Sequence, residues 1–228
     1  MNDVPSFLVN GIPAGMVDTF VHLVLSPDES DAGRLIEQLL DDGVSSESIM
    51  LELLGPAARL MGELWCSDDL SFLDVTLGMS RLQRLMRQMR LPAGGLMPER
   101  GTALLMPVPG EQHVLGLRMV EELLVRDGWR VLAIHSAKDH LPGQIVADEA
   151  FDFVGFSISG ERLLPALRQT IREVRAQSRN PQVRIMVGGV ALLGQDRPAP
   201  PLDADAVVGD ALEAVAQARR WRALAGVN

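Results

Sequence analysis

The sequence predicts a bundle of helices followed by an α/β domain built on a parallel sheet, and three observations lead to this fold class. Apolar residues recur at helical spacing through roughly the first 90 residues. After residue 101, short apolar runs typical of buried strands alternate with amphipathic helical patterns. Between the two patterns, residues 91–101 hold two prolines and three glycines, which is typical of a linker. We therefore predict a helical bundle over residues 1–91, a linker at 92–101 and an α/β domain over 102–228.

Four helices are expected in the first half, at residues 14–25, 30–42, 46–64 and 70–90. Ser30 and Ser46 are expected as N-caps, because a serine hydroxyl accepts a hydrogen bond from a free N–H of the first helical turn. Gly43 is expected to end the second helix. The connections are short, so the helices should form an antiparallel four-helix bundle.

Strands and helices are expected to alternate in the second half. The strands are predicted at residues 103–108, 130–135, 153–158, 183–187 and 205–208. The helices are predicted at residues 114–126, 142–149, 161–177 and 210–224, with a short one after Gly189. This alternation predicts a doubly wound, five-stranded parallel sheet with helices on both faces. In a flavodoxin-like order, the first, third and fourth strands are neighbours and their following loops share one crevice.

Composition narrows the class of protein. The 228 residues are 47% hydrophobic and 22% charged, as in ordinary globular proteins. A net charge of −9 argues against a general nucleic-acid surface, so any contact with DNA should pass through a partner. No apolar run is long enough to cross a membrane, and the N-terminus lacks the basic start of a signal peptide. A single cysteine, Cys66, excludes an intrachain disulfide and a multi-cysteine metal site. We expect a cytoplasmic protein.

A candidate metal ligand, His113, follows the first predicted strand. Glu111 stands two residues before it, and Gly116 lies three residues after it at the start of the next predicted helix. Neutral imidazole is a common metal ligand. A carboxylate on its other ring nitrogen fixes the tautomer and raises the basicity of the ligand. The alternative for His113 taken alone is an ordinary surface histidine.

Two further loops strengthen the metal-ligand interpretation. Ser157 and Ser159 lie at the end of the third predicted strand, and Gly188 and Gly189 follow the fourth. Serine hydroxyls can bond a heterocyclic nitrogen or a phosphate, and a glycine pair lets a ligand approach the backbone. Because these strands should be neighbours of the first, the three loops are expected to meet at the carboxyl end of the sheet.

These loops resemble a known signature. The pattern Glu111-x-His113-x-x-Gly116, then Ser157-x-Ser159, then Gly188-Gly189, resembles the D-x-H-x-x-G, S-x-L and G-G motifs of cobalamin-binding domains of the methionine-synthase type. In that family the histidine replaces the cofactor's own dimethylbenzimidazole as lower axial ligand to cobalt. The displaced nucleotide tail then inserts beside the serine and the glycine pair.

The resemblance implies a role for each motif residue. His113 would be the lower ligand and Glu111 its supporting carboxylate. Ser157 would contact the tail, which Gly188 and Gly189 would leave room for. The chain departs from the pattern twice: Glu111 stands where aspartate is usual, and Ser159, where leucine is usual, would alter one wall of the tail pocket.

The helical half resembles the cap that covers the upper face of cobalamin in this family. Trp65 ends a segment like the cap's Leu-Trp motif and would lie over the corrin, the alternative being a core tryptophan of the bundle. Light-sensing cobalamin regulators carry a Glu-His pair ten residues later, where this chain has Val75 and Thr76. Thr76 stands at the position of that histidine and is therefore expected to contact the cofactor. Without that pair, the resemblance implies a small upper ligand, such as water, hydroxide or methyl, in place of 5′-deoxyadenosyl.

The closest resemblance is to the antirepressor family of photosynthetic bacteria, of the AerR/PpaA type. Residues 71–85 and 109–119 carry it, within a likeness that runs from about residue 14 to the C-terminus. It implies a cobalamin-binding regulator, responsive to light or redox state, that acts through a protein partner, a transcriptional repressor. One alternative is a corrinoid carrier for methyl transfer. Another is a heme-binding redox sensor, because a branch of the family holds heme. No nucleophile–base set or phosphate-binding loop predicts an enzyme.

Several other residues have more than one interpretation. Arg81, Arg84, Arg87 and Arg90 would make one side of the fourth helix basic, either as a docking face or as an ordinary solvated surface. Cys66 is expected as a small buried residue of the bundle, the alternative being a thiolate near the metal. The remaining histidines are expected on the protein surface, although a contact with heme or a pH response is open for the second and third: His22, His135 and His140.

Overall fold

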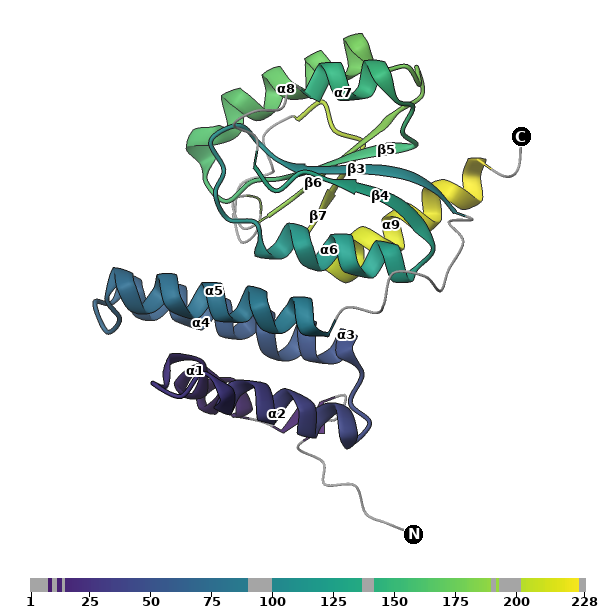
Figure 1. Cartoon of the computed structure of the whole chain (residues 1–228). Coiled ribbons are helices and arrows are strands. Elements are labelled where there is room, and N and C mark those ends of the chain that lie inside the picture. The colour runs from purple at the N-terminus through teal and green to yellow at the C-terminus, as the bar shows by residue number, and fades with distance from the viewer. Residues whose placement is uncertain are drawn as a thin grey trace. The chain divides into compact units, whose positions relative to one another are not determined.

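The computed structural model of the chain is shown in Figure 1. It divides into two compact units, Met1–Ala93 and Gly94–Asn228, and the division falls within the segment predicted as the linker. The described residues are 8–9, 12–13, 15–89, 100–136, 142–189, 192 and 202–225. Within them, no helix combines the length and apolarity that crossing a lipid bilayer requires. The predictions for Arg90 and His140 lie outside the described residues.

The first unit contains the predicted helices. After a short hairpin of β1 (Leu8–Val9) and β2 (Ile12–Pro13), its elements are α1 (Met16–Leu25), α2 (Ser30–Asp41), α3 (Ser46–Ser48), the π-helical segment η1 (Ile49–Leu54), α4 (Gly55–Cys66) and α5 (Phe72–Gln88). The third predicted helix is thus a run of three segments. All of Ile49, Met50, Leu53 and Leu54 are fully buried, so the π-helical turn lies in the bundle core.

Both predicted N-caps were wrong by one residue. Ser30 is already helical, and Asp28 Oδ1 accepts from its N–H at 2.9 Å, because aspartate is as good an acceptor as serine. Ser45, not Ser46, caps α3 by accepting from Ser48 N–H at 3.0 Å. Gly43 directly follows the end of α2 with φ +85°, as expected of a glycine that terminates a helix.

The second unit has the predicted doubly wound architecture. Its strands are β3 (Gly101–Pro107), β4 (Trp129–Ala133), β5 (Phe153–Ser157), β6 (Arg184–Gly188) and β7 (Ala206–Val208), all parallel in the order β4-β3-β5-β6-β7. Helices α6 (Leu115–Arg126) and α9 (Ala211–Ala225) cover one face; α7 (Pro142–Asp148), the 3-10 turn η2 (Glu161–Leu163) and α8 (Leu164–Gln177) lie on the other (Figure 1). The flavodoxin-like order is confirmed, since β3 lies between β4 and β5.

The central strands are buried on both faces of the sheet, which explains their continuous apolar sequences. Residues 103–106 of β3 are all buried, because helices cover both faces of the sheet. One side of the sheet packs Leu104, Val154 and Ile185 against Leu167 and Ile171 of α8. This core fixes the carboxyl ends of β3, β5 and β6 beside one another.

Candidate functional site

The loop after β3 brings a carboxylate and an imidazole to the carboxyl end of the sheet. Val108 N–H donates to the carbonyl of Ser157 at 3.1 Å and so continues the pairing of β3 with β5. Gly110 then takes φ +90°, and Glu111 N–H closes the turn by donating to the Val108 carbonyl at 2.9 Å. The turn reverses the chain before α6 begins at residue 115, which leaves residues 111–114 above the strand end.

Glu111 is a buried carboxylate whose oxygens are occupied by hydrogen bonds. Oε1 accepts from the backbone N–H groups of Gln112 and His113, each at 2.8 Å, and Oε2 accepts from Ser159 N–H at 2.5 Å. Burial raises the pKa of this carboxyl, but the hydrogen bonds from His113 and Ser159 outweigh burial and lower the pKa of Glu111 to about 2. The group is therefore an anion at neutral pH.

His113 is held through one ring nitrogen. Its Nδ1 lies 2.7 Å from Glu111 Oε1 and 2.9 Å from the hydroxyl oxygen of Ser159. Because an ionised carboxylate can only accept, Nδ1 carries the proton and donates to Glu111. In the neutral form of the ring the lone pair is then on Nε2, and the His113 side chain is 73% exposed. This is the protonation pattern of an imidazole prepared to bind a metal.

Ser159 contributes to this pair in a way the sequence did not predict. It was expected to form a wall of the tail pocket, whereas its N–H binds Glu111 and its hydroxyl lies against Nδ1 of His113. The longer glutamate reaches a backbone N–H on the neighbouring strand's loop. The only signal in the sequence was that both departures from the family motif, Glu111 and Ser159, occur together.

Ser157 fits the predicted role of a polar contact for a ligand. It ends β5 opposite Gly188 of β6, and its hydroxyl oxygen is buried without a hydrogen-bond partner among the residues that the structure describes. A buried hydroxyl without a hydrogen-bond partner destabilises the fold unless a ligand or a water molecule supplies the partner. Ser157 therefore offers an unused donor and acceptor close to the loop of His113.

The three glycines of the motif differ from one another. Gly189 has φ +128°, and a side chain there would collide with the backbone of Ile158. At Gly188 an added Cβ would lie 3.1 Å from the Val208 side chain. The space beside these two glycines, which was expected to receive the nucleotide tail, is thus occupied by Ile158 and Val208. Gly116, in the first turn of α6, has nothing within 4 Å of an added Cβ, so a ligand can approach the backbone there.

The predicted contacts of the helical unit lie on its surface. Trp65 is 48% exposed at the end of α4, so the alternative of a core tryptophan was wrong. Thr76 is exposed, and its hydroxyl donates to the carbonyl of Phe72 at 2.7 Å. Cys66 is exposed as well, which contradicts the expectation of a buried cysteine. Large apolar side chains lie near these residues in sequence, with Phe72 73% exposed and Leu73 63% exposed.

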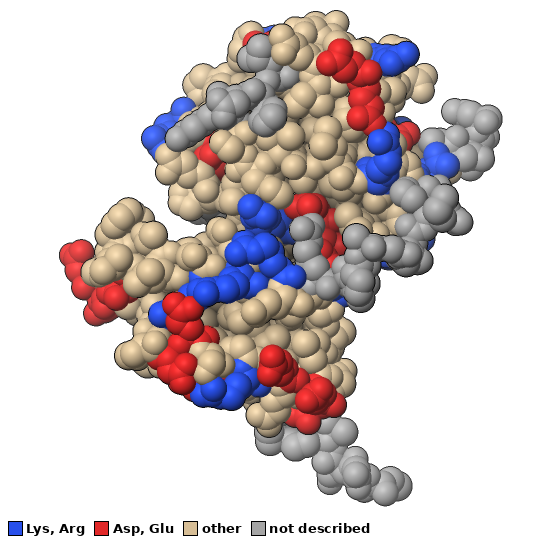
Figure 2. Space-filling view, in the orientation of Figure 1, with Lys and Arg blue, Asp and Glu red and all other residues tan. Residues whose placement is uncertain are grey.

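The predicted basic side of α5 is partly structural. Arg81 Nη1 donates to the carbonyls of Val24 and Ser26 at 2.6 and 2.7 Å and so satisfies the end of α1. Arg84 pairs with Glu29 at 2.8 Å. Figure 2 shows arginine side chains gathered on the helical unit with acidic residues beside them. These arginines serve the bundle first, which weakens their interpretation as a docking face.

Two other predicted histidines have hydrogen-bond partners inside their own units. His135 Nε2 lies 2.7 Å from Glu121 Oε2, and His22 Nδ1 lies 2.8 Å from the carbonyl of Asp18. Neither belongs to a cluster of three or more metal-ligating side chains, since the described part of the chain contains none. Only His113 is thus placed at the carboxyl end of β3 together with Ser157 and Ser159, among the histidines of known position.

Comparison with known proteins shows the family of the chain. Residues 101–219 match a family model described as a B12 binding domain, and residues 16–89 match a second model of the same description. An uncharacterized 20.5 kDa protein from the bchF-crtJ intergenic region of Rhodobacter capsulatus is 26% identical over 170 residues, 73% of this chain and 88% of that protein. The fold matches the monomethylamine corrinoid protein of Methanosarcina barkeri with a TM-score of 0.74 at 16% identity, over 90% of this chain and 97% of that one.

Proposed function

The chain belongs to the B12-binding domain family, and from this premise we propose that it is a regulator that uses cobalamin to sense light or redox state and acts on a protein partner. The family matches confirm cobalamin as the predicted cofactor. The proposed site rests on the geometry of His113. Its Nδ1 is hydrogen-bonded to Glu111, and its side chain is exposed, so that Nε2 is available to bind a metal.

The residues at the sheet edge fit the lower side of such a cofactor. A corrin supplies the equatorial ligands of its cobalt, so one protein imidazole is sufficient below it. We assign that position to His113 Nε2, with Glu111 and Ser159 holding the ring in place. The unpartnered hydroxyl of Ser157 would bind the displaced nucleotide tail, and Gly116 would allow close approach. Bound cobalamin would supply a metal centre at which ligand exchange responds to light or to reduction.

The helical unit supports a small upper ligand. The position that is histidine in the light-sensing regulators is Thr76 here, and its hydroxyl is already used on the Phe72 carbonyl. The large apolar side chains exposed near it in sequence, Phe72, Leu73 and Leu77, offer no hydrogen bond to a ribose or an adenine. We therefore propose water, hydroxide or methyl as the upper ligand.

Regulation through a partner is the finer part of the proposal. Its support is the antirepressor resemblance together with a relative from the bchF-crtJ region, a photosynthesis gene cluster. A ligand shifts a conformational equilibrium only if it binds the two states with different affinity. The exposed apolar residues Trp65, Phe72 and Leu73 provide a surface whose burial could differ between states. The proposed partner is a transcriptional repressor, and a corrinoid carrier is the alternative.

Ultraviolet–visible spectra test the proposal. The protein is mixed with hydroxocobalamin, desalted in the dark and measured before and after illumination, beside His113→Ala and a control, His22→Ala. We expect corrin absorbance to be retained by the wild type and the control, and to be lost or shifted in His113→Ala. A light-dependent change in the capture of a repressor would support the regulator, whereas capture of a methyltransferase would favour the carrier. A Soret band after heme addition, without bound corrin, would contradict the cofactor assignment.

A further inference from the structure

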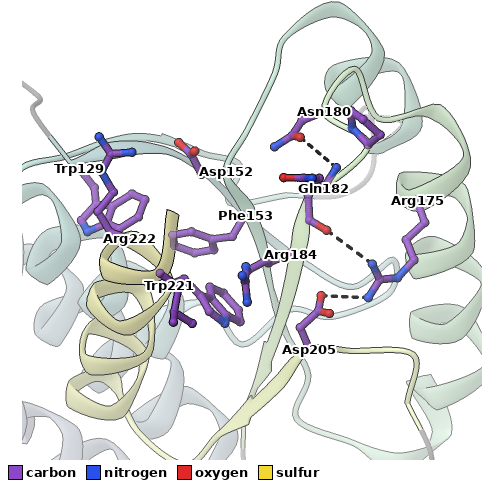
Figure 3. Close-up of a pocket in the computed structure, with 13 residues that line it drawn as sticks. Trp129, Asp152, Phe153, Arg175, Asn180, Gln182, Arg184, Asp205, Trp221 and Arg222 are labelled. Atoms are coloured by element: carbon purple, nitrogen blue, oxygen red, sulfur yellow. Dashed lines mark hydrogen bonds and ion pairs between the residues drawn. The ribbon is translucent and has the colours of Figure 1, made fainter. Parts of the chain in front are cut away.

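A pocket lies at the opposite edge of the sheet from His113. It is a hollow of about 570 Å³ at the amino-terminal ends of the strands, lined by the first residues of β4, β5 and β6 and by the last turns of α9 (Figure 3). This volume is within the range of small-molecule sites, roughly 300–1,000 Å³. None of the residues of the cobalamin motif lines it.

Three aromatic rings form one wall of this amino-edge pocket. Trp129 and Phe153 meet edge to face with ring centroids 5.1 Å apart, and Phe153 and Trp221 lie 5.7 Å apart. The two tryptophans are 3% and 6% exposed, so their rings are fixed by packing. The guanidinium carbon of Arg184 lies 5.6 Å from the centre of the Trp221 ring. Guanidinium groups in this arrangement stack on planar groups and still bind oxyanions at their edge.

The carboxylates that line the pocket have hydrogen-bond partners, whereas two of its guanidinium groups have no anionic partner among the described residues. Both carboxylates already bind backbone N–H groups: Asp152 accepts from Thr102 at 2.7 Å, and Asp205 accepts from Ile185 at 2.6 Å. Asp205 also pairs with Arg175 at 2.9 Å. No residue in the described ranges gives Arg184 or Arg222 a carboxylate partner. Within the described part of the chain, the pocket therefore presents two guanidinium groups without an anionic partner, although the net charge of the protein is −9.

We propose that the amino-edge pocket binds a small organic oxyanion that carries a planar ring. The ring would extend the stack of Trp221 and Arg184, and the oxyanion would bind the edge of the Arg184 guanidinium group. Phosphate and carboxylate both have the geometry for such bonds. A ligand at this edge would add a second, chemically distinct input to a protein whose cofactor site is at the other edge.

Fluorescence titration tests this proposal, because two of the three tryptophans line the pocket. In a Trp65→Phe background the signal comes from Trp129 and Trp221 alone. AMP is the phosphate probe and benzoate the carboxylate probe, with adenosine and inorganic phosphate as the separate halves of AMP. We expect saturable quenching by AMP or benzoate that is weaker for either half, with the stronger of the two identifying the oxyanion.

Matched variants separate specific binding from general charge. Arg184→Gln should weaken binding by about tenfold or more, the loss expected for a hydrogen bond to a charged group. Arg220→Gln removes an exposed cation of α9 that, among the described residues, binds Gln217, and it should leave affinity unchanged, as should His113→Ala. Circular dichroism checks that each variant is folded. Absence of saturable binding at millimolar probe, equal loss in Arg220→Gln, or binding of a glutamate-rich peptide but neither small anion would overturn the proposal.

Discussion

The two edges of the sheet use their carboxylates in the same way but leave different groups free. At the carboxyl edge, Glu111 accepts from three backbone N–H groups and binds the His113 imidazole through Nδ1, and Nε2 has no partner among the described residues. At the amino edge, Asp152 and Asp205 are likewise bound to backbone N–H groups, and the groups left over are guanidiniums. Carboxylates bound to backbone N–H groups are thus common to both edges. Under our two proposals the remaining group decides the chemistry, as a metal ligand at one edge and an anion receptor at the other.

Removing one carboxylate from each edge gives the largest expected contrast. Glu111→Ala leaves the N–H groups of His113 and Ser159 without an acceptor and frees the imidazole, so cobalamin affinity should fall by roughly 10–100-fold. The free energy of unfolding should fall by about 1–3 kcal/mol for each N–H group that is left without an acceptor. Asp152→Ala should cost less stability, because Asp152 is exposed, and should leave cobalamin affinity intact. Calorimetry and chemical unfolding measure both, and equal affinity losses would contradict the division of roles.

The low pKa of Glu111 predicts a dependence of stability on pH. A carboxyl whose pKa is about 2 in the folded chain, against an ordinary 4.5, stabilises the fold at any pH above the ordinary value. This contribution is lost as the pH falls from about 4.5 towards about 2. Glu111→Gln has no such group, so the difference in unfolding free energy between wild type and variant should shrink over that interval. A constant difference would show that Glu111 is not held as an anion. 

Two glycines of the cofactor motif should respond in opposite ways to alanine. Gly189→Ala places a side chain at φ +128° against the Ile158 backbone and should destabilise the fold by about 1–3 kcal/mol. Thermal unfolding of the protein without cofactor measures this loss. An unchanged melting temperature would show that residue 189 does not require glycine.

Gly116→Ala has the smallest expected effect on the fold. Its Cβ meets nothing within 4 Å, and alanine favours a helix interior by about 1 kcal/mol, so stability should stay equal or rise slightly. Cobalamin affinity should fall if the cofactor approaches this backbone. An affinity equal to that of the wild type would place the cofactor elsewhere on the loop.

Much of the fold could be predicted because burial leaves a strong pattern in the sequence. The run at 103–106 is apolar since both faces of β3 are covered, and this fixed the strand and the class of sheet. Local choices were harder, because Asp28 and Ser45 compete with Ser30 and Ser46 as acceptors at helix starts. Helical periodicity also could not decide whether Trp65 was buried, because its exposure depends on how α4 ends.

The site was predictable in its residues and less so in its contacts. The loops of His113 and Ser157 could be brought together from the strand order alone. The bond from Ser159 to Glu111 spans 48 residues and depends on side-chain reach, which no periodicity reports. The amino-edge pocket was missed for the same reason: Arg184 and Trp221 come from β6 and α9, and nothing in either segment indicates that they meet.

Electron paramagnetic resonance of the bound cofactor in its Co(II) state tests the central claim most directly. Protein with histidine labelled by ¹⁵N is compared with unlabelled protein, each loaded with the same unlabelled cobalamin. If His113 Nε2 is the lower ligand, the nitrogen splitting changes from triplets to doublets on labelling, and His22→Ala leaves this change intact. Triplets that persist in the labelled protein would show that the cofactor keeps its own dimethylbenzimidazole, and would contradict the assignment of His113.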